Sequence, residues 1–186
     1  MQATPETSAA PRRDPRAAGL DLESVYTAHV AVVWRFLRSM GVRDSDVEDV
    51  CQEVFVVVHR NLAAFDGRHP ISTWLYAICL RTASAYRRKA SFRREVLTDA
   101  PPEAPLEAGQ PDALARREAQ RFLARVLDDL DEEKRAVFVL YEIEEAPMAE
   151  VAAALGCPLQ TAYSRLHAAR AHVEAATRRY HLRGQR

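Results

Sequence analysis

Residues 65–89 read FDGRHPISTWLYAICLRTASAYRRK, and this stretch is the most informative part of the chain. A loop leads into a predicted helix that opens with Trp74 and ends in three consecutive basic residues. On a helix Trp74, Arg81 and Arg88 share one stripe, because they are seven residues apart. A second, apolar stripe about 100° away consists of Leu75, Cys79, Thr82 and Tyr86. A helix that buries one face and offers an aromatic ring and positive charge on the other is typical of nucleic-acid binding, particularly of unpaired bases.

The charges of the chain are segregated along the sequence. The 186 residues suit one ordinary domain or two small ones, and the composition, 48% hydrophobic and 28% charged, is typical of a folded protein. The formal net charge is zero. However, residues 81–94 hold six bases and no acid, residues 95–111 hold four acids and no base, and residues 148–186 hold six arginines against two acids. Local charge decides what each surface attracts, so the zero sum does not exclude a nucleic-acid binder.

The sequence offers no pattern for a metal site, a cofactor or a membrane span. The three cysteines have no zinc-site spacing, and His167 and His172 are five apart, which does not place two ligands on one helix face. There is no Gly-rich phosphate loop and no nucleophile beside a base, so an enzyme is the least expected class. No apolar run is long enough for a signal peptide or a transmembrane helix. We therefore expect a soluble cytoplasmic protein with reduced cysteines and no metal or cofactor.

The first half of the chain predicts a compact helical domain over residues 21–94, after a disordered tail over 1–20. Asp21 is a plausible N-cap of a helix that Gly41 ends, and Ser45 with Glu48 forms a predicted capping box for the next helix. The buried stripe of the first helix is predicted to include Tyr26. That of the second consists of Val47, Val50, Cys51, Val54, Phe55, Val58 and Leu62, and its polar face carries Glu48, Asp49, Gln52, Glu53 and Arg60.

The second half predicts a smaller helical domain over residues 112–180, after an acidic, Pro-rich linker over 95–111 and before a tail over 181–186. Helices are expected over 112–130, from Asp131 through Tyr141, over 148–156, and from Pro158 onward. The last helix has an apolar stripe of Leu159, Ala162, Leu166, Ala169, Val173 and Ala176. A short helix, a turn with Gly156 and a longer helix form a helix-turn-helix signature. The predicted fold is all-α, with two small helical domains joined by a flexible linker.

Four motifs together resemble the extracytoplasmic-function (ECF) group of bacterial sigma factors in the sigma-70 family. Residues 49–55, DVCQEVF, resemble the region 2.2 pattern, and Phe65 with 74–78 and the basic run 87–89 resembles regions 2.3 and 2.4. Residues 155–170 resemble the region 4.2 helix-turn-helix. The match covers roughly residues 21–180 in the order of the family. Each motif alone is weak, whereas the ordered set is specific.

The resemblance implies a protein that binds core RNA polymerase and directs it to promoter DNA. Asp49, Gln52 and Glu53 would dock on the clamp helices of the largest polymerase subunit. The flap of the polymerase is a further implied contact, and an anti-sigma factor is an expected regulator. The residues implied at the −10 element are Arg68, His69, Ser72, Thr73, Trp74, Arg81, Arg87 and Arg88. Those implied at the −35 element are Gln160, Thr161, Tyr163, Ser164, Arg165, His167 and Arg170.

The sequence departs from the family pattern at three positions, and it leaves alternatives open. Relatives often carry Asn at Arg81 and basic residues at Tyr163 and Ala168, so the promoter sequence does not transfer from relatives. Trp74 could brace the loop before it instead of stacking on DNA. A stand-alone helix-turn-helix regulator has no need of the basic helix. A sigma mimic that titrates an anti-sigma protein would be expected to lose the basic helix and the reading helix, and both are present.

Overall fold

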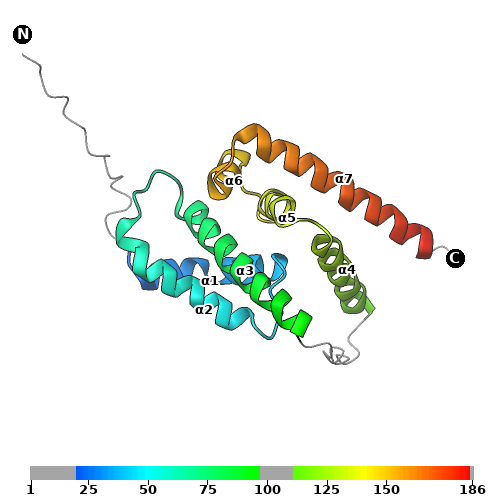
Figure 1. Cartoon of the computed structure of the whole chain (residues 1–186), viewed down its shortest axis with the longest axis horizontal. Coiled ribbons are helices and arrows are strands. Elements are labelled where there is room, and N and C mark those ends of the chain that lie inside the picture. The colour runs from blue at the N-terminus through cyan, green and yellow to red at the C-terminus, as the bar shows by residue number, and fades with distance from the viewer. Residues whose placement is uncertain (1–19, 97–110, 185–186) are drawn as a thin grey trace, which may run out of the picture.

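The computed structural model describes residues 20–96 and 111–184, and within these ranges the regular structure is entirely helical. A first unit contains α1 (Leu22–Ser39), α2 (Val47–Asn61), the short 3₁₀ turn η2 (Leu62–Ala64) and α3 (Ile71–Val96). A second unit contains α4 (Pro111–Asp128), α5 (Glu132–Phe138), the π-helical turn η3 (Val139–Ile143), α6 (Met148–Leu155) and α7 (Leu159–Gly184). The predicted all-α fold is therefore confirmed (Figure 1). The predicted N-terminal tail, apart from Leu20, and most of the predicted linker lie outside the described residues.

The helix ends follow local sequence in most places. The carboxylate of Asp21 accepts a hydrogen bond from the backbone N–H of Ser24 at 2.7 Å, and this bond lowers the pKa of Asp21. Gly41 follows α1 with a φ of +86°, which favours glycine because a Cβ crowds the left-handed region. The capping box predicted for α2 is wrong. The N-cap residue is Asp46, whose carboxylate instead accepts hydrogen bonds from the hydroxyls of Ser45 and, at 2.5 Å, Tyr86 of α3.

The first unit packs three amphipathic helices around one apolar core. The valine stripe of α2 is buried against α1 and α3, as the sequence predicts. The aromatic-basic helix begins at Ile71, three residues before Trp74, and its apolar stripe buries Leu75 and Cys79. Tyr26, predicted to be buried, is instead exposed, with its ring edge-on to Phe55 at 4.7 Å between centroids.

The second unit contains the helix-turn-helix, α6 and α7, joined by Gly156 with a φ of +61°. The helix from Asp131 does not continue as an α-helix through Tyr141. It turns π-helical at Val139, where the N–H of Glu144 donates to the carbonyl of Val139, five residues earlier. The extra residue in this turn leads into Glu145, which has a φ of +54°. At its other end the unit extends beyond expectation, because α7 continues to Gly184 through most of the predicted tail.

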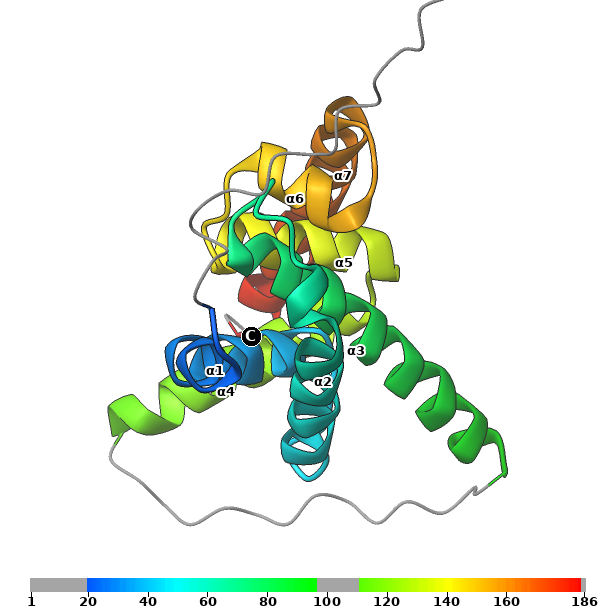
Figure 2. The same ribbon diagram turned by 90° about the vertical axis from the view of Figure 1, so that its left-hand side faces the viewer.

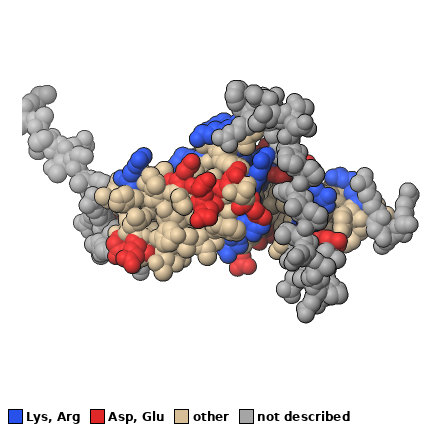
Figure 3. All heavy atoms as spheres, turned by 90° about the horizontal axis from the view of Figure 1, so that it is seen from below, with Lys and Arg blue, Asp and Glu red and all other residues tan. Residues whose placement is uncertain are grey.

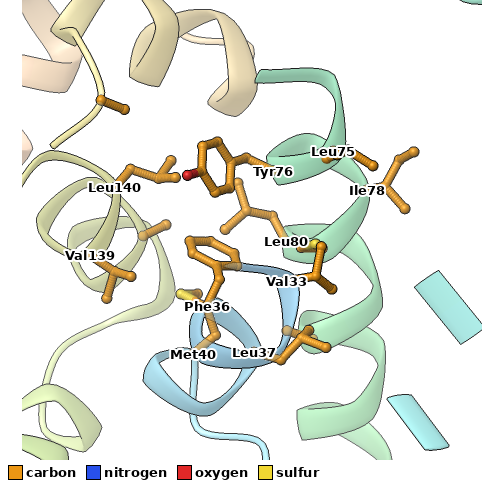
Figure 4. Packing of buried hydrophobic residues seen from close by; sticks show 14 of the residues in the cluster. Val33, Phe36, Leu37, Met40, Leu75, Tyr76, Ile78, Leu80, Val139 and Leu140 are labelled. Carbon is orange, nitrogen blue, oxygen red and sulfur yellow. The ribbon is translucent and has the colours of Figure 1, made fainter. Parts of the chain in front are cut away.

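The two units pack against each other and share one apolar core. Figure 1 shows α1–α3 on one side and α4–α7 on the other, and α6 of the second unit contacts α3 of the first. At the contact, Phe36 and Tyr76 of the first unit meet Val139 and Leu140 of the second (Figure 4). The rings of Phe36 and Tyr76 have centroids 5.2 Å apart. Amphipathic patterns within each half did not predict this contact, because it joins residues far apart in the sequence.

Candidate nucleic-acid and polymerase interfaces

The three residues predicted to dock on the polymerase lie on the exposed face of α2. Asp49, Gln52 and Glu53 are all exposed, opposite the buried valine stripe. Val56, which sequence reasoning did not single out, is 47% exposed and lies one helical turn from Gln52 and Glu53. Its position outside the buried valine stripe could have identified it as exposed from the sequence. Figure 3, which views the side on which α2 lies in Figure 1, shows acidic side chains gathered on this face.

The loop before α3 is organised by its own side chains. One carboxylate oxygen of Asp66 accepts a hydrogen bond from the backbone N–H of Arg68 at 3.1 Å, and the other lies 3.0 Å from the Nε of Arg68. Gly67 between them has a φ of +72°. Arg68 and His69 are exposed. The loop therefore presents a guanidinium and an imidazole to solvent from an ordered turn.

Trp74 packs against this loop. Its ring lies 5.4 Å from the ring of Phe65 at an interplanar angle of 51°, and the side chain is half-buried. This contact favours the alternative in which Trp74 braces the loop. Ser72 is half-buried, whereas Thr73 is only 3% exposed. The hydroxyl of Thr73 donates a hydrogen bond to the carboxylate of Glu150 in α6 at 2.8 Å.

The basic residues along α3 differ in their environments. Arg81 and Arg88 are exposed, and the Nη1 of Arg88 donates to the hydroxyl of Ser84 at 2.7 Å, one turn earlier. Arg87 is half-buried and points toward the end of α1 in the same unit, where its Nη1 donates to the carbonyl oxygen of Met40 at 3.5 Å. The C-terminal half of α3 extends away from the second unit (Figure 2). The end of α3 is therefore accessible to a large polyanion.

The helix-turn-helix exposes a continuous stripe along α7. Gln160, Tyr163, Ser164 and His167 are exposed, and their spacing places them on one face. Thr161 is half-buried. Tyr163 is 49% exposed, so a hydroxyl and an aromatic edge lie among the polar groups.

Leu159 was predicted to belong to the buried stripe of the last helix, and this was wrong. It is 47% exposed, while Ala162, Leu166 and Ala169 of the same stripe are buried. Leu159 is the first residue of α7, and side chains on a helix point toward its N-terminus. Its side chain therefore points past the end of the helix, where no turn covers it.

The two arginines beside this stripe are held by acids of the same unit. Arg165 forms an ion pair with Glu133 in the first turn of α5. Arg170 donates from Nε to Glu142 of η3 at 2.6 Å, and its guanidinium lies 5.5 Å from the ring centroid of Tyr141. The acids lie 32 and 28 positions away in the sequence, and no local pattern indicated them. These pairs fix the direction of both guanidinium groups.

The described part of the chain offers no metal-binding cluster, and two of its cysteines are buried. No cluster of His, Cys, Asp and Glu within it could hold a metal ion, and none of its helices is long and apolar enough to cross a membrane. Cys51 and Cys79 are buried, and burial raises the pKa of both thiols. They are therefore protonated near neutral pH, which makes them poor nucleophiles.

Comparison with known proteins identifies the family. The family model described as "Sigma-70 region 2" matches residues 25–93, and the one described as "Sigma-70, region 4" matches residues 121–173. The chain is 32% identical over 147 residues to the ECF RNA polymerase sigma-E factor of Escherichia coli (strain K12), covering 74% of this chain and 77% of the relative. The chain belongs to the ECF group of the sigma-70 family. As a sigma factor, it directs RNA polymerase to promoters.

Further relatives agree with this family. The chain is 32% identical over 155 residues to the RNA polymerase sigma factor CnrH of Cupriavidus metallidurans, covering 79% of this sigma factor and 81% of CnrH. The structure of CnrH in complex with the cytosolic domain of CnrY has a TM-score of 0.65 at 30% identity, covering 87% of this chain and 91% of that one. The sigma factor RpoE of Bartonella quintana, in complex with the anti-sigma factor NepR, shares the fold with a TM-score of 0.67 at 18% identity, covering 85% and 97%.

Proposed function

We propose that this sigma factor divides its work between its two units. The first unit, over about residues 21–94, binds core polymerase and the −10 element, and the second, over about 112–180, reads the −35 element. The observation that carries the proposal is that three sets of predicted contact residues lie on three separate surfaces. These are the acidic face of α2, the loop and outer side of α3, and the outer stripe of α7. The protein acts by binding in the cytoplasm and has no catalytic role of its own.

The acidic face of α2 is proposed as the polymerase-binding surface. Asp49, Gln52 and Glu53 supply charge and hydrogen-bond acceptors, and Val56 adds an exposed apolar contact one turn beyond Gln52 and Glu53. Charge complementarity steers association and fixes register, while the apolar contact adds burial. The partner surface is expected to be basic with an apolar patch, which the clamp helices of the polymerase would provide.

The loop and the outer side of α3 are proposed to bind the −10 element. Arg68, His69, Arg81 and Arg88 offer exposed groups to an unpaired strand and its phosphates. The basic end of α3 carries the three consecutive residues 87–89 without an acid nearby in sequence. Trp74 is proposed to hold the loop in place, and the role of Thr73 requires that it first leave Glu150.

The outer stripe of α7 is proposed to enter the major groove at the −35 element. Gln160, Ser164 and His167 carry donors and acceptors for base edges, and Tyr163 combines a hydroxyl with an apolar ring. Arg165 and Arg170 are directed by Glu133 and Glu142 and are placed for the flanking phosphates. At Tyr163 and Ala168, where the family pattern has basic residues, the reading face of this chain is uncharged.

Run-off transcription with purified core polymerase tests the proposal. The sigma factor should form a complex with core and direct initiation from a subset of fragments of its own genome. A chain that binds core but directs initiation from no fragment would contradict the promoter role, as a sigma mimic would. Binding to duplex DNA without any affinity for core would instead favour a stand-alone regulator. We further propose an anti-sigma factor as its regulator, supported by the partner-bound structures of CnrH and RpoE.

A further inference from the structure

The two units are joined by polar contacts at the surface that is proposed to bind the −10 element. Thr73 belongs to that surface, yet its hydroxyl donates to Glu150 of α6 at 2.8 Å, and only 3% of the residue is exposed. Figure 2 shows α6 lying beside the N-terminal end of α3. A carboxylate in this position also repels the phosphates of an approaching strand. The second unit therefore covers part of the −10 surface sterically and electrostatically.

A second polar contact also joins the two units. Arg35 of α1 donates to both carboxylate oxygens of Glu144, from Nε at 3.0 Å and from Nη2 at 2.6 Å. The Glu144 side chain is 2% exposed, whereas the Arg35 side chain is 55% exposed. This bidentate pair carries charge-assisted hydrogen bonds, which are stronger and more directional than neutral ones. It joins residues 109 positions apart in the sequence, one in each unit.

A third contact buries a charge between the units. Arg135 of α5 is fully buried and donates from Nη1 to the carbonyl oxygen of Met40 in the first unit at 3.2 Å. Its Nη2 lies 3.0 Å from a carboxylate oxygen of Asp128, which remains largely exposed. Among the described residues, the Nε of Arg135 has no hydrogen-bond partner. A buried guanidinium that is incompletely hydrogen-bonded weakens the interface it lies in. These contacts thus fix the geometry of the closed arrangement, while the incompletely hydrogen-bonded guanidinium lowers its stability.

From these contacts we propose that the free sigma factor is closed by an intramolecular latch, in which Glu144 and Glu150 of the second unit hold Arg35 and Thr73 of the first. In the closed form Thr73 is occupied and the −10 surface is partly covered. Opening frees this surface and separates the second unit, so that the two units can reach separate promoter elements. The masking half of this proposal rests on the proposed −10 role of Thr73, whereas the latch itself does not.

The latch is tested by replacing both carboxylates in the full chain. In Glu144→Ala with Glu150→Ala, each lost charged hydrogen bond should shift the opening equilibrium by roughly ten-fold or more. Small-angle X-ray scattering should then report a larger radius of gyration than the original chain has. The control is Asp44→Ala with Glu23→Ala, which removes two exposed acids within the first unit. That variant has the same net charge as the latch variant and should keep the original dimensions.

Masking is tested on the same proteins with a fluorescein-labelled single-stranded oligonucleotide of random sequence. Fluorescence anisotropy should show several-fold tighter binding by the latch variant than by the control. Both variants have lost two negative charges, so the difference reports the uncovered surface and not the change in net charge. Far-UV circular dichroism verifies folding. If the alanine variant loses helix, Glu144→Gln with Glu150→Gln serves instead, since it keeps the side-chain volumes.

Each result decides a separate statement. Equal radii for the latch variant and the control, or an original chain that is already extended, would overturn the latch. A larger radius with no gain in oligonucleotide binding over the control would overturn the masking. Failure of run-off transcription by the original chain would count against the proposed function and leave the scattering result unaffected.

Discussion

The substitution Gly41→Ala tests the contact between the two units with a single methyl group. An ideal Cβ at Gly41 would lie 2.6 Å from the Nη1 of Arg135 and 3.2 Å from a carboxylate oxygen of Asp128. The first distance is shorter than real Cβ contacts, so the guanidinium must move. Arg135 is fully buried and donates to the carbonyl of Met40, the residue next to Gly41. The methyl group should therefore break a contact that belongs to the other unit.

The expected loss has two parts. Gly41 has a φ of +86°, and placing alanine in the left-handed region costs about 1–2 kcal/mol. Displacing Arg135 from Met40 adds about 1.5–3 kcal/mol for a hydrogen bond with a charged donor. Gly156 provides a matched control, because it has a φ of +61° and no atom within 4 Å of an ideal Cβ. Gly156→Ala should cost only the first part, about 1–2 kcal/mol.

Urea unfolding of the full chain, followed by far-UV circular dichroism, measures both losses. Gly41→Ala should lower the free energy of unfolding by about 1.5–3 kcal/mol more than Gly156→Ala does. In an Arg135→Ala background this excess should disappear, because the group that the methyl displaces is gone. Equal losses at the two glycines would refute the reasoning. An excess loss for Gly41→Ala that persists in the Arg135→Ala background would also refute it.

Three further outcomes are expected. Glu53→Arg should weaken core binding about ten-fold or more in a pull-down titration, whereas Glu23→Arg, which makes the same charge change at the exposed start of α1, should not. Arg87→Ala with Arg88→Ala should lower promoter affinity and flatten its log–log salt dependence by about 0.9 per lost phosphate contact, and an unchanged slope would remove both residues from the interface. Burial, and next the charge of a neighbouring carboxylate, raises the pKa of Tyr76 from 10.0 to about 12. The phenol therefore stabilises the fold fully below pH 10, and this contribution is lost as the pH rises toward 12. Tyr76→Phe should remove the loss of unfolding free energy that this phenol causes at alkaline pH, about 2–3 kcal/mol by urea unfolding. If the free energy of unfolding depends on alkaline pH as it does in the original chain, the assignment is contradicted.

Helix positions in this sigma factor could be predicted from the sequence because they depend on local spacing. Asp21, Asp131 and Gly156 mark helix ends by their own chemistry, and each acts as predicted. The capping box at Ser45 failed because Asp46 takes the N-cap position and Tyr86, 40 residues away, fixes its carboxylate. A distant hydroxyl competes with a local cap, and sequence spacing does not contain that information.

The candidate sites were predictable to the level of a helix face but not to the level of each side chain. Gln160, Ser164 and His167 are exposed as predicted, because solvent-facing positions follow from the apolar stripe. The free or paired state of a charged residue was not predictable. Arg88 remains at the surface of α3, while Arg165 is paired with an acid 32 positions away.

The sequence by itself determined the positions of the helices, most of their buried faces and the family of this protein. These depend on residues within a few positions of one another and on motifs in a fixed order. Only the tertiary structure decided that Thr73 is covered by Glu150, that Glu144 is held by Arg35, and that Arg135 is buried between the units. Such contacts join residues 77 to 109 positions apart. They form only when two separately amphipathic units dock, and the spacing within either unit does not specify that geometry.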